Sequence, residues 1–173
     1  MGNVLSVMTL VATVAARNAP ADQYFGKLEM SSLRIRYEAM QLRKRYETHQ
    51  LLPEQAKHLL DLTDDAFNRW AAAYPRDAWL ASTGFIIAAL YDELPGSAAR
   101  DRSVALFVFV KSHFPTTSYA AQSRELLHRG IALKPEPAWA ASMRAATSPP
   151  SPAQSPTPTP TIVPSSKPSE VPL

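Results

Sequence analysis

The chain has 173 residues, of which 46% are hydrophobic, with five glycines, sixteen prolines and no cysteine. The lack of cysteine excludes disulfides, thiolate zinc sites, a cysteine nucleophile and a lipidated N-terminal cysteine. The formal net charge of +3 is small beside the concentrated charge of nucleic-acid-binding proteins. Because glycine is scarce, glycine-rich loops of a parallel-sheet enzyme are not expected, and the composition favours one all-α domain.

The N-terminal segment carries an apolar run over residues 3–16, which is shorter than the roughly 20 residues that a membrane-spanning helix needs. The run suits the hydrophobic region of a signal peptide, and Ala19-Pro20-Ala21 fits a signal-peptidase site. Met1-Gly2-Asn3 lacks the basic residue that usually precedes such a run. We predict a signal peptide over residues 1–21, with a hydrophobic helix that caps the domain, or a membrane anchor, as alternatives.

The first helix is expected from Lys27 to about His49. Its apolar residues recur at spacings near three and four, which is the helical period: Met30, Leu33, Tyr37, Met40 and Leu42. Basic residues lie between them: Arg34, Arg36, Arg43, Lys44 and Arg45. A solvated face is the plainest interpretation of these charges, and contact with an acidic partner or an anionic lipid headgroup is the alternative.

The second helix is expected to begin at Pro53, because proline lacks only an N–H that the first helical turn does not use. It should end at Tyr74, since Pro75 disfavours helical geometry in the residue before it. Its apolar face is formed by Ala56, Leu59, Leu60, Thr63, Phe67 and Trp70.

Three more helices follow, each bounded by a polar capping residue and a breaker. The third is expected over 78–93, after Asp77, and the fourth over 98–113, after Ser97. The fifth is expected over 118–129, after Thr117, and should stop at Gly130. A weaker sixth helix is expected over 137–146, and no strand signal competes with this all-α pattern.

The ends of the second and fourth helices match each other at one fixed offset along the chain. Tyr74-Pro75 corresponds to Phe114-Pro115, and the capping residue Asp77 corresponds to Thr117. The aromatic Trp79 corresponds to Tyr119, Ala81 to Ala121, and Phe67 to Phe107. A match at a fixed offset of about 40 residues indicates repeated helical hairpins, and the uncovered face of each hairpin must be buried by a neighbouring one.

These junctions resemble those of tetratricopeptide-repeat proteins, and more narrowly the Tyr-Pro-x-Ser-x-Tyr-Ala junctions of bacterial envelope proteins. The resemblance covers about residues 27–130, and it extends to Gly84, Ala88 and Tyr91 on one helix and to Ser103 and Phe107 on the next. The period here is longer than the family's usual one of about 34 residues, and the family usually has three or more repeats. The resemblance implies antiparallel hairpins stacked as a short right-handed solenoid that binds other proteins.

A catalytic or metal-binding bundle is the alternative hypothesis. Glu54, His58, Asp61 and Asp65 share one face of the second helix, as metal ligands of helical bundles do. The other helices offer no matching inward set, and no phosphate loop, G-x-S-x-G or H-E-x-x-H motif occurs. A solvated polar stripe is the simpler interpretation, and His49, His113 and His128 suit the last turns of helices.

Residues 148–173 are rich in proline, serine and threonine and are expected to form an extended, disordered tail. The tail could act as a spacer, a docking peptide or a glycosylated stalk.

The sequence therefore predicts a helical repeat domain over residues 22–147. Our leading hypothesis, in line with the resemblance, is that this domain is a non-enzymatic protein-interaction adaptor of the bacterial envelope. We expect the protein to be periplasmic or secreted, and a cytoplasmic location is the alternative. We expect no cofactor, no specific binding of nucleic acid and no stable transmembrane span. Self-association is left open, and a purely structural domain is a third alternative. Candidate partner-binding or repeat-junction residues are Trp70, Tyr74, Trp79, Tyr91, Phe114 and Tyr119.

Overall fold

The computed structural model describes residues 18–147, and this part of the chain forms helices and no strand. The helices are α1 (Ser32–Glu47), α2 (Pro53–Ala73), α3 (Trp79–Glu93), α4 (Ser97–His113), α5 (Ser118–Arg129) and α6 (Ala138–Thr147). The all-α prediction is confirmed for these residues. Residues 1–17 and 148–173, which hold most of the predicted signal peptide and the whole predicted tail, lie outside the described residues.

The segment before α1 is not helical from Lys27, which differs from the prediction. Phe25 and Met30 pair through two backbone hydrogen bonds of 2.9 Å, which close a tight turn, and both side chains are buried. Gly26 in this turn has a φ of 70° and lies against the backbone of α2 at Ala66. The helix starts after Ser31, whose hydroxyl accepts a hydrogen bond from the backbone N–H of Arg34.

The boundaries of α2, α4 and α5 follow the breakers in the sequence. Pro53 occupies the first turn of α2, and the side chain of Thr117 caps α5 by accepting from the N–H of Ala120. The expectation that Ser97 caps α4 is wrong by one residue. Gly96 is the cap, with a φ of 96° that an L-residue rarely adopts, and Ser97 is the first helical residue.

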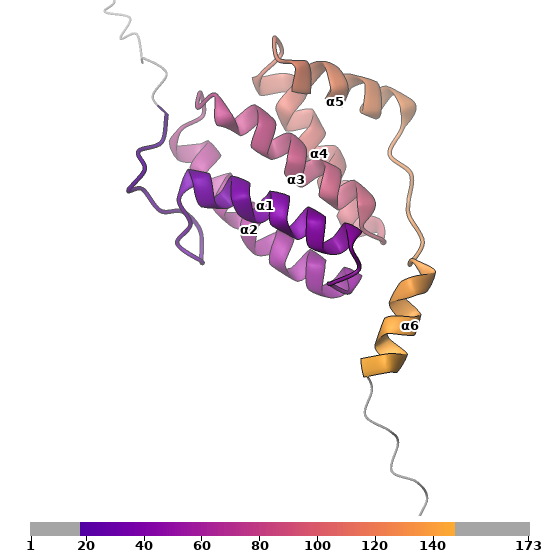
Figure 1. Cartoon of the computed structure of the whole chain (residues 1–173). Helices are drawn as coiled ribbons and strands as arrows, with labels where there is room; N and C mark the ends of the chain where they lie inside the picture. The colour runs from indigo at the N-terminus through magenta and orange to yellow at the C-terminus, as the bar shows by residue number, and fades with distance from the viewer. Residues whose placement is uncertain (1–17, 148–173) are drawn as a thin grey trace, which may run out of the picture.

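Helix α3 lies at the centre of the stack and packs against α1, α2, α4 and α5 (Figure 1). Small residues allow this close approach. A Cβ placed on Gly84 would lie 2.9 Å from the ring of Phe67 in α2 and 3.2 Å from Val110 in α4. The hydroxyl of Ser103 in α4 donates to the carbonyl of Ala88 in α3 at 2.9 Å. The core therefore depends on small side chains where three helices converge.

The two aromatic-proline junctions have the same local backbone geometry. Tyr74 has φ and ψ of −132° and 63°, and Phe114 has −129° and 50°. Each of these residues donates its backbone N–H four positions back, to Trp70 and Val110 respectively. The carbonyl of each also accepts from the backbone N–H three positions later, of Asp77 and of Thr117, at 3.0 Å in both junctions. Ala78, and not Asp77 as predicted, is the cap of α3. The offset seen in the sequence therefore corresponds to a structural repeat of the turn.

Helix α6 does not continue the stack beyond α5. The linker of residues 130–137 runs past the turn between α3 and α4, where the carbonyl of Lys134 accepts from the N–H of Gly96, and α6 lies beside the loop that joins α1 to α2 (Figure 1). Trp139 stacks on His49 there, with ring centroids 4.3 Å apart, and meets the ring of Tyr46 edge-on. The end of the described chain thus returns to its first hairpin.

None of the helices in the described range is both long enough and apolar enough to span a bilayer.

Candidate functional site

Helix α1 carries two apolar stripes, and only one of them is buried. Ile35, Ala39, Leu42 and Tyr46 form the buried stripe, which belongs to the hydrophobic core. The other stripe also has helical spacing but faces solvent, and it continues onto the first residue of α3. Its exposed fractions are 65% for Leu33, 60% for Tyr37, 50% for Met40 and 48% for Trp79. Together with the partly buried Ile86 of α3, these residues are called the α1–α3 face below.

The α1–α3 face is held in place by arginines that join the two helices. Arg36 lies over the ring of Trp79, with its Cζ 4.7 Å from the ring centroid, and donates a hydrogen bond of 2.6 Å to the hydroxyl of Ser82. Arg43 makes ion pairs of 2.9 Å with Glu93 of α3 and with Glu47 of its own helix. These contacts fix the apolar side chains of α1 beside those of α3, so the face has a defined shape.

Two depressions adjoin the seam between α1 and α3. The first, of about 190 Å³, lies where the start of α1 meets the junction between α2 and α3, and Leu33, Arg36 and Trp79 line it together with Ser32, Trp70, Asp77 and the N-terminal residues Asn18, Ala19 and Ala21. The second, of about 330 Å³, is lined by Met40, Arg43, Lys44, Glu47 and Ile86. The first depression holds one basic residue, Arg36, besides Asp77, and the second holds Arg43 and Lys44 beside Glu47.

The first junction is organised by a buried carboxylate. Asp77 accepts hydrogen bonds from the indole Nε1 of Trp70 at 3.0 Å, from the backbone N–H of Ala19 at 2.8 Å and from the backbone N–H of Trp79 at 3.0 Å. Three donors thus satisfy a carboxylate that is almost fully buried. Asp77 therefore positions the start of α3, and with it the exposed indole of Trp79.

The six aromatic residues singled out in the sequence do not share one surface. Trp70 and Tyr91 are fully buried in the core. Tyr74 and Phe114 are partly buried at the two junctions, where the Tyr74 hydroxyl donates to Gln23 at 2.9 Å. Tyr119 is partly buried beside Phe85. Trp79 is the member of this set that belongs to the α1–α3 face.

The exposed residues of α1 are not among the site residues predicted from the sequence, although the sequence holds a signal for them. When a helix has two apolar stripes at helical spacing, only the stripe that neighbouring helices cover is buried. Sequence spacing singles out Leu33, Tyr37 and Met40 as apolar residues of the helix, whereas Ile35, Ala39 and Tyr46 are the residues that pack against the core.

The polar face of α2, considered above as a metal site, is engaged in other contacts. Arg144 of α6 makes two hydrogen bonds to Glu54, and Asp65 accepts from Arg69 and from the backbone of Lys27. Asp61 accepts from Lys57 and from the hydroxyl of Tyr91, both at 2.7 Å. Within residues 18–147, no three His, Cys, Asp or Glu side chains are grouped so that they could hold a metal ion.

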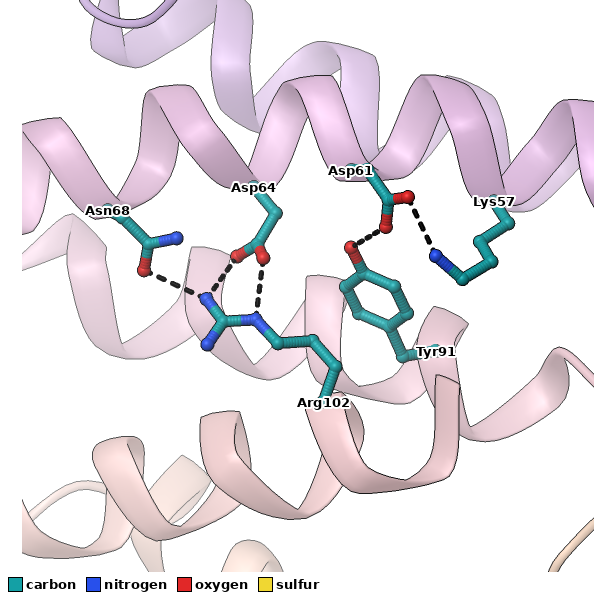
Figure 2. A network of polar contacts seen from close by, with 6 residues as sticks. All are labelled: Lys57, Asp61, Asp64, Asn68, Tyr91 and Arg102. Carbon is teal, nitrogen blue, oxygen red and sulfur yellow. Dashed lines mark hydrogen bonds and ion pairs between the residues drawn. The ribbon is translucent and has the colours of Figure 1, made fainter. Parts of the chain in front are cut away.

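A polar network joins α2 to α3 and α4, as Figure 2 shows. Arg102 of α4 binds Asp64 of α2 through two hydrogen bonds, of 2.6 and 2.7 Å, and also donates to Asn68 at 2.8 Å. Burial raises the pKa of Asp64, and the Arg102 guanidinium opposes that rise. The hydrogen bond to Asp64 raises the pKa of Arg102. Burial is also the main cause of the raised pKa of Tyr91, whose hydroxyl therefore stays protonated. This network ties adjacent helices together.

No family model matches the chain, and neither the curated proteins nor the solved structures contain a match.

Proposed function

We propose that this chain is a non-enzymatic protein-interaction module, built from stacked helical hairpins of the tetratricopeptide kind, that works in the bacterial cell envelope. The observation that carries the proposal is the α1–α3 face. Exposed apolar side chains gathered on one surface mark an interaction site more often than singly scattered ones do. Here they lie on two neighbouring helices that are fixed to each other by Arg36 and Arg43.

The repeated junction supports the hairpin-stack part of the proposal. The turns at Tyr74 and Phe114 share dihedral angles and hydrogen bonds, and they occupy equivalent places in the sequence repeat. Helices α1, α3 and α5 occupy successive positions, in which α3 contacts both of the others. In a stack of hairpins, alternate helices of this kind line one surface of the array and present it to a partner.

The envelope part of the proposal rests on the apolar run of residues 3–16 and on Ala19-Pro20-Ala21. Processing after Ala21 would remove Ala19, which donates to the buried carboxylate of Asp77. The test is the mass of the N-terminus of the protein isolated from its source cells. A mature chain that begins at Asp22 supports export, and a chain that retains Met1 contradicts it.

The interaction function is tested by photo-crosslinking in an extract of the source cells. A crosslinking amino acid at position 37, in the α1–α3 face, should join the full chain to a small number of specific proteins. The same amino acid at position 108 is the matched control, because Val108 is also an exposed apolar residue but lies on α4. Equal and unspecific products from both positions would contradict the proposal.

A further inference from the structure

The spacing of the two depressions on the α1–α3 face constrains what can bind there. Leu33 and Arg36 line one depression, and Met40 and Arg43 line the other, so matching residues are seven positions apart in one helix. Seven residues at 1.5 Å each span about 10.5 Å, or two helical turns. Tyr37 lies between them on the same exposed stripe. A ligand helix with apolar side chains at positions i, i+4 and i+7 has the same spacing.

The charged side chains around the α1–α3 face indicate which charge a ligand should carry. Helix α1 holds five basic and two acidic residues, so its net charge equals that of the whole chain, +3. Arg34, Arg36 and Arg43 have acidic or aromatic partners, whereas Lys44 and Arg45 have no ion pair among the described residues. Lys44 also lines the second depression. Acidic side chains on the ligand would therefore meet uncompensated positive charge at this end of the seam.

A second copy of the chain fits this face poorly. Pairing one α1 with another would bring the same basic side chains together, and like charges in contact oppose association.

We propose that the seam between α1 and α3 binds an acidic amphipathic helix of another protein, with apolar residues at i, i+4 and i+7. The outer apolar side chains enter the depressions beside Leu33 and Met40, and the middle one packs on Tyr37. A carboxylate on the flank of the ligand helix pairs with Lys44, which lines the second depression. This inference rests on the proposed function and specifies the chemistry of the partner.

The test uses the full chain and three labelled peptides of equal length. The first is a helix-forming peptide with leucine at i, i+4 and i+7 and glutamate on its flanks. The second carries lysine in place of each glutamate. The third has the composition of the first with its leucines moved out of helical spacing. Binding is measured by fluorescence anisotropy, and we expect the first peptide to bind about tenfold or more tightly than either of the others, which corresponds to about 1.4 kcal/mol.

Two variants locate the binding site. Leu33→Ser combined with Tyr37→Ser should weaken the first peptide about tenfold, and so should Lys44→Gln, whereas Arg45→Gln, which lines neither depression, should leave binding nearly unchanged. All four positions are exposed, so the helical circular dichroism should not change. Val108→Ser and Arg124→Gln, at exposed positions on α4 and α5, are the matched controls and should leave binding unchanged.

Several outcomes would overturn the inference. These are equal binding of the three peptides, binding that the α1 variants do not alter, or sedimentation with phosphatidylglycerol vesicles that depends on Lys44 and Arg45. A dimer in analytical ultracentrifugation that Tyr37→Ser abolishes would do the same. If position 37 crosslinks a native partner while the peptides show no preference, the interaction function stands and the acidic-helix inference fails. If no native partner is crosslinked, the interaction function itself fails.

Discussion

At the scale of single residues, the stability of the stack depends on polar groups that are buried only because each has a specific partner. Asp64 lies beneath the surface of α2, and Arg102 reaches it from α4 with two hydrogen bonds. Such a pair adds little compared with apolar packing, but the loss of one member leaves a buried charge without its counterion. The same logic applies to Asp77 and its three donors.

Arg102→Ala should lower the free energy of unfolding by about 2–3 kcal/mol at neutral pH, because the Asp64 carboxylate would remain buried without its counterion. In the variant, burial raises the pKa of Asp64 without opposition from the guanidinium. When the pKa of a carboxyl group is higher in the folded than in the unfolded state, the free energy of unfolding falls as the pH rises through the interval between the two pKa values. The deficit should therefore shrink as the pH is lowered from neutrality.

Urea denaturation at a series of pH values checks this prediction. Arg100→Ala, on the same helix with an exposed ion pair, is the control and should change stability by less than about 1 kcal/mol. A deficit for Arg102→Ala that is the same at every pH would contradict the role assigned to Asp64.

Substitutions at two glycines with positive φ distinguish the cost of backbone strain from the cost of steric overlap. A Cβ on Gly26 would lie 2.6 Å from the Cα of Ala66, whereas a Cβ on Gly130 would have no atom within 4 Å. Gly130→Ala should lower the free energy of unfolding by about 1–2 kcal/mol through strain alone. Gly26→Ala adds overlap with a helix backbone and should cost about 3–4 kcal/mol. Thermal unfolding of both variants measures the two losses in free energy of unfolding. Equal losses would show that the turn at Gly26 can shift away from α2 without cost.

At the scale of elements, α6 is attached to the stack through few residues. Trp139 stacks on His49, and Arg144 binds Glu54 of α2 and Glu136 of the linker. Hydrogen bonding from Arg144 lowers the pKa of Glu54. A carboxylate with a lowered pKa contributes stability above its ordinary pKa and loses it as the pH falls through the lowered value.

We therefore expect α6 to detach from α2 as the pH falls below the ordinary pKa of a glutamate, before the stack of α1 to α5 unfolds. The indole NMR signal of Trp139 should shift at a pH where those of Trp70 and Trp79 are unchanged. Glu54→Gln should produce the same shift at neutral pH, and His58→Gln, one turn further along α2, is the control. Simultaneous shifts of all three indoles would contradict an independent α6.

Local breakers explain how much of this architecture the sequence could predict. Proline restricts its own φ and the residue before it, so the ends of α2 and α4 follow from Pro75 and Pro115 without any tertiary information. The predicted start of α1 is too early, because Lys27 to Ser31 has no breaker as strong and the turn there is set by contact between Gly26 and α2.

Long-range features could not be obtained in this way. Asp64 and Arg102 are 38 residues apart, and no local pattern pairs them. The choice between the two stripes of α1 is equally beyond the sequence, because both have helical spacing and the positions of α2 and α3 decide which stripe is buried. The candidate site consists mainly of the stripe that α2 does not cover, so Trp79 is the one residue of it that the sequence predicts.

At the scale of the whole molecule, α3 connects all the helices of the stack. It packs against α1, α2, α4 and α5, whereas α6 touches mainly the first interhelical loop (Figure 1). Native-state hydrogen exchange should therefore be slowest in α3, with protection close to that of global unfolding, and fastest in α6. Protection of α6 equal to that of α3 would show that the six helices open together.

The return of α6 to the first hairpin also determines how the molecule bears tension. Any pull on the chain beyond Thr147 acts first on the stacked rings of Trp139 and His49 and on the salt bridges of Arg144, and only afterwards on α5. Those contacts would break first under load and release α6, while Lys134 still holds the linker at Gly96 and Asp92 and the helices of the stack stay folded.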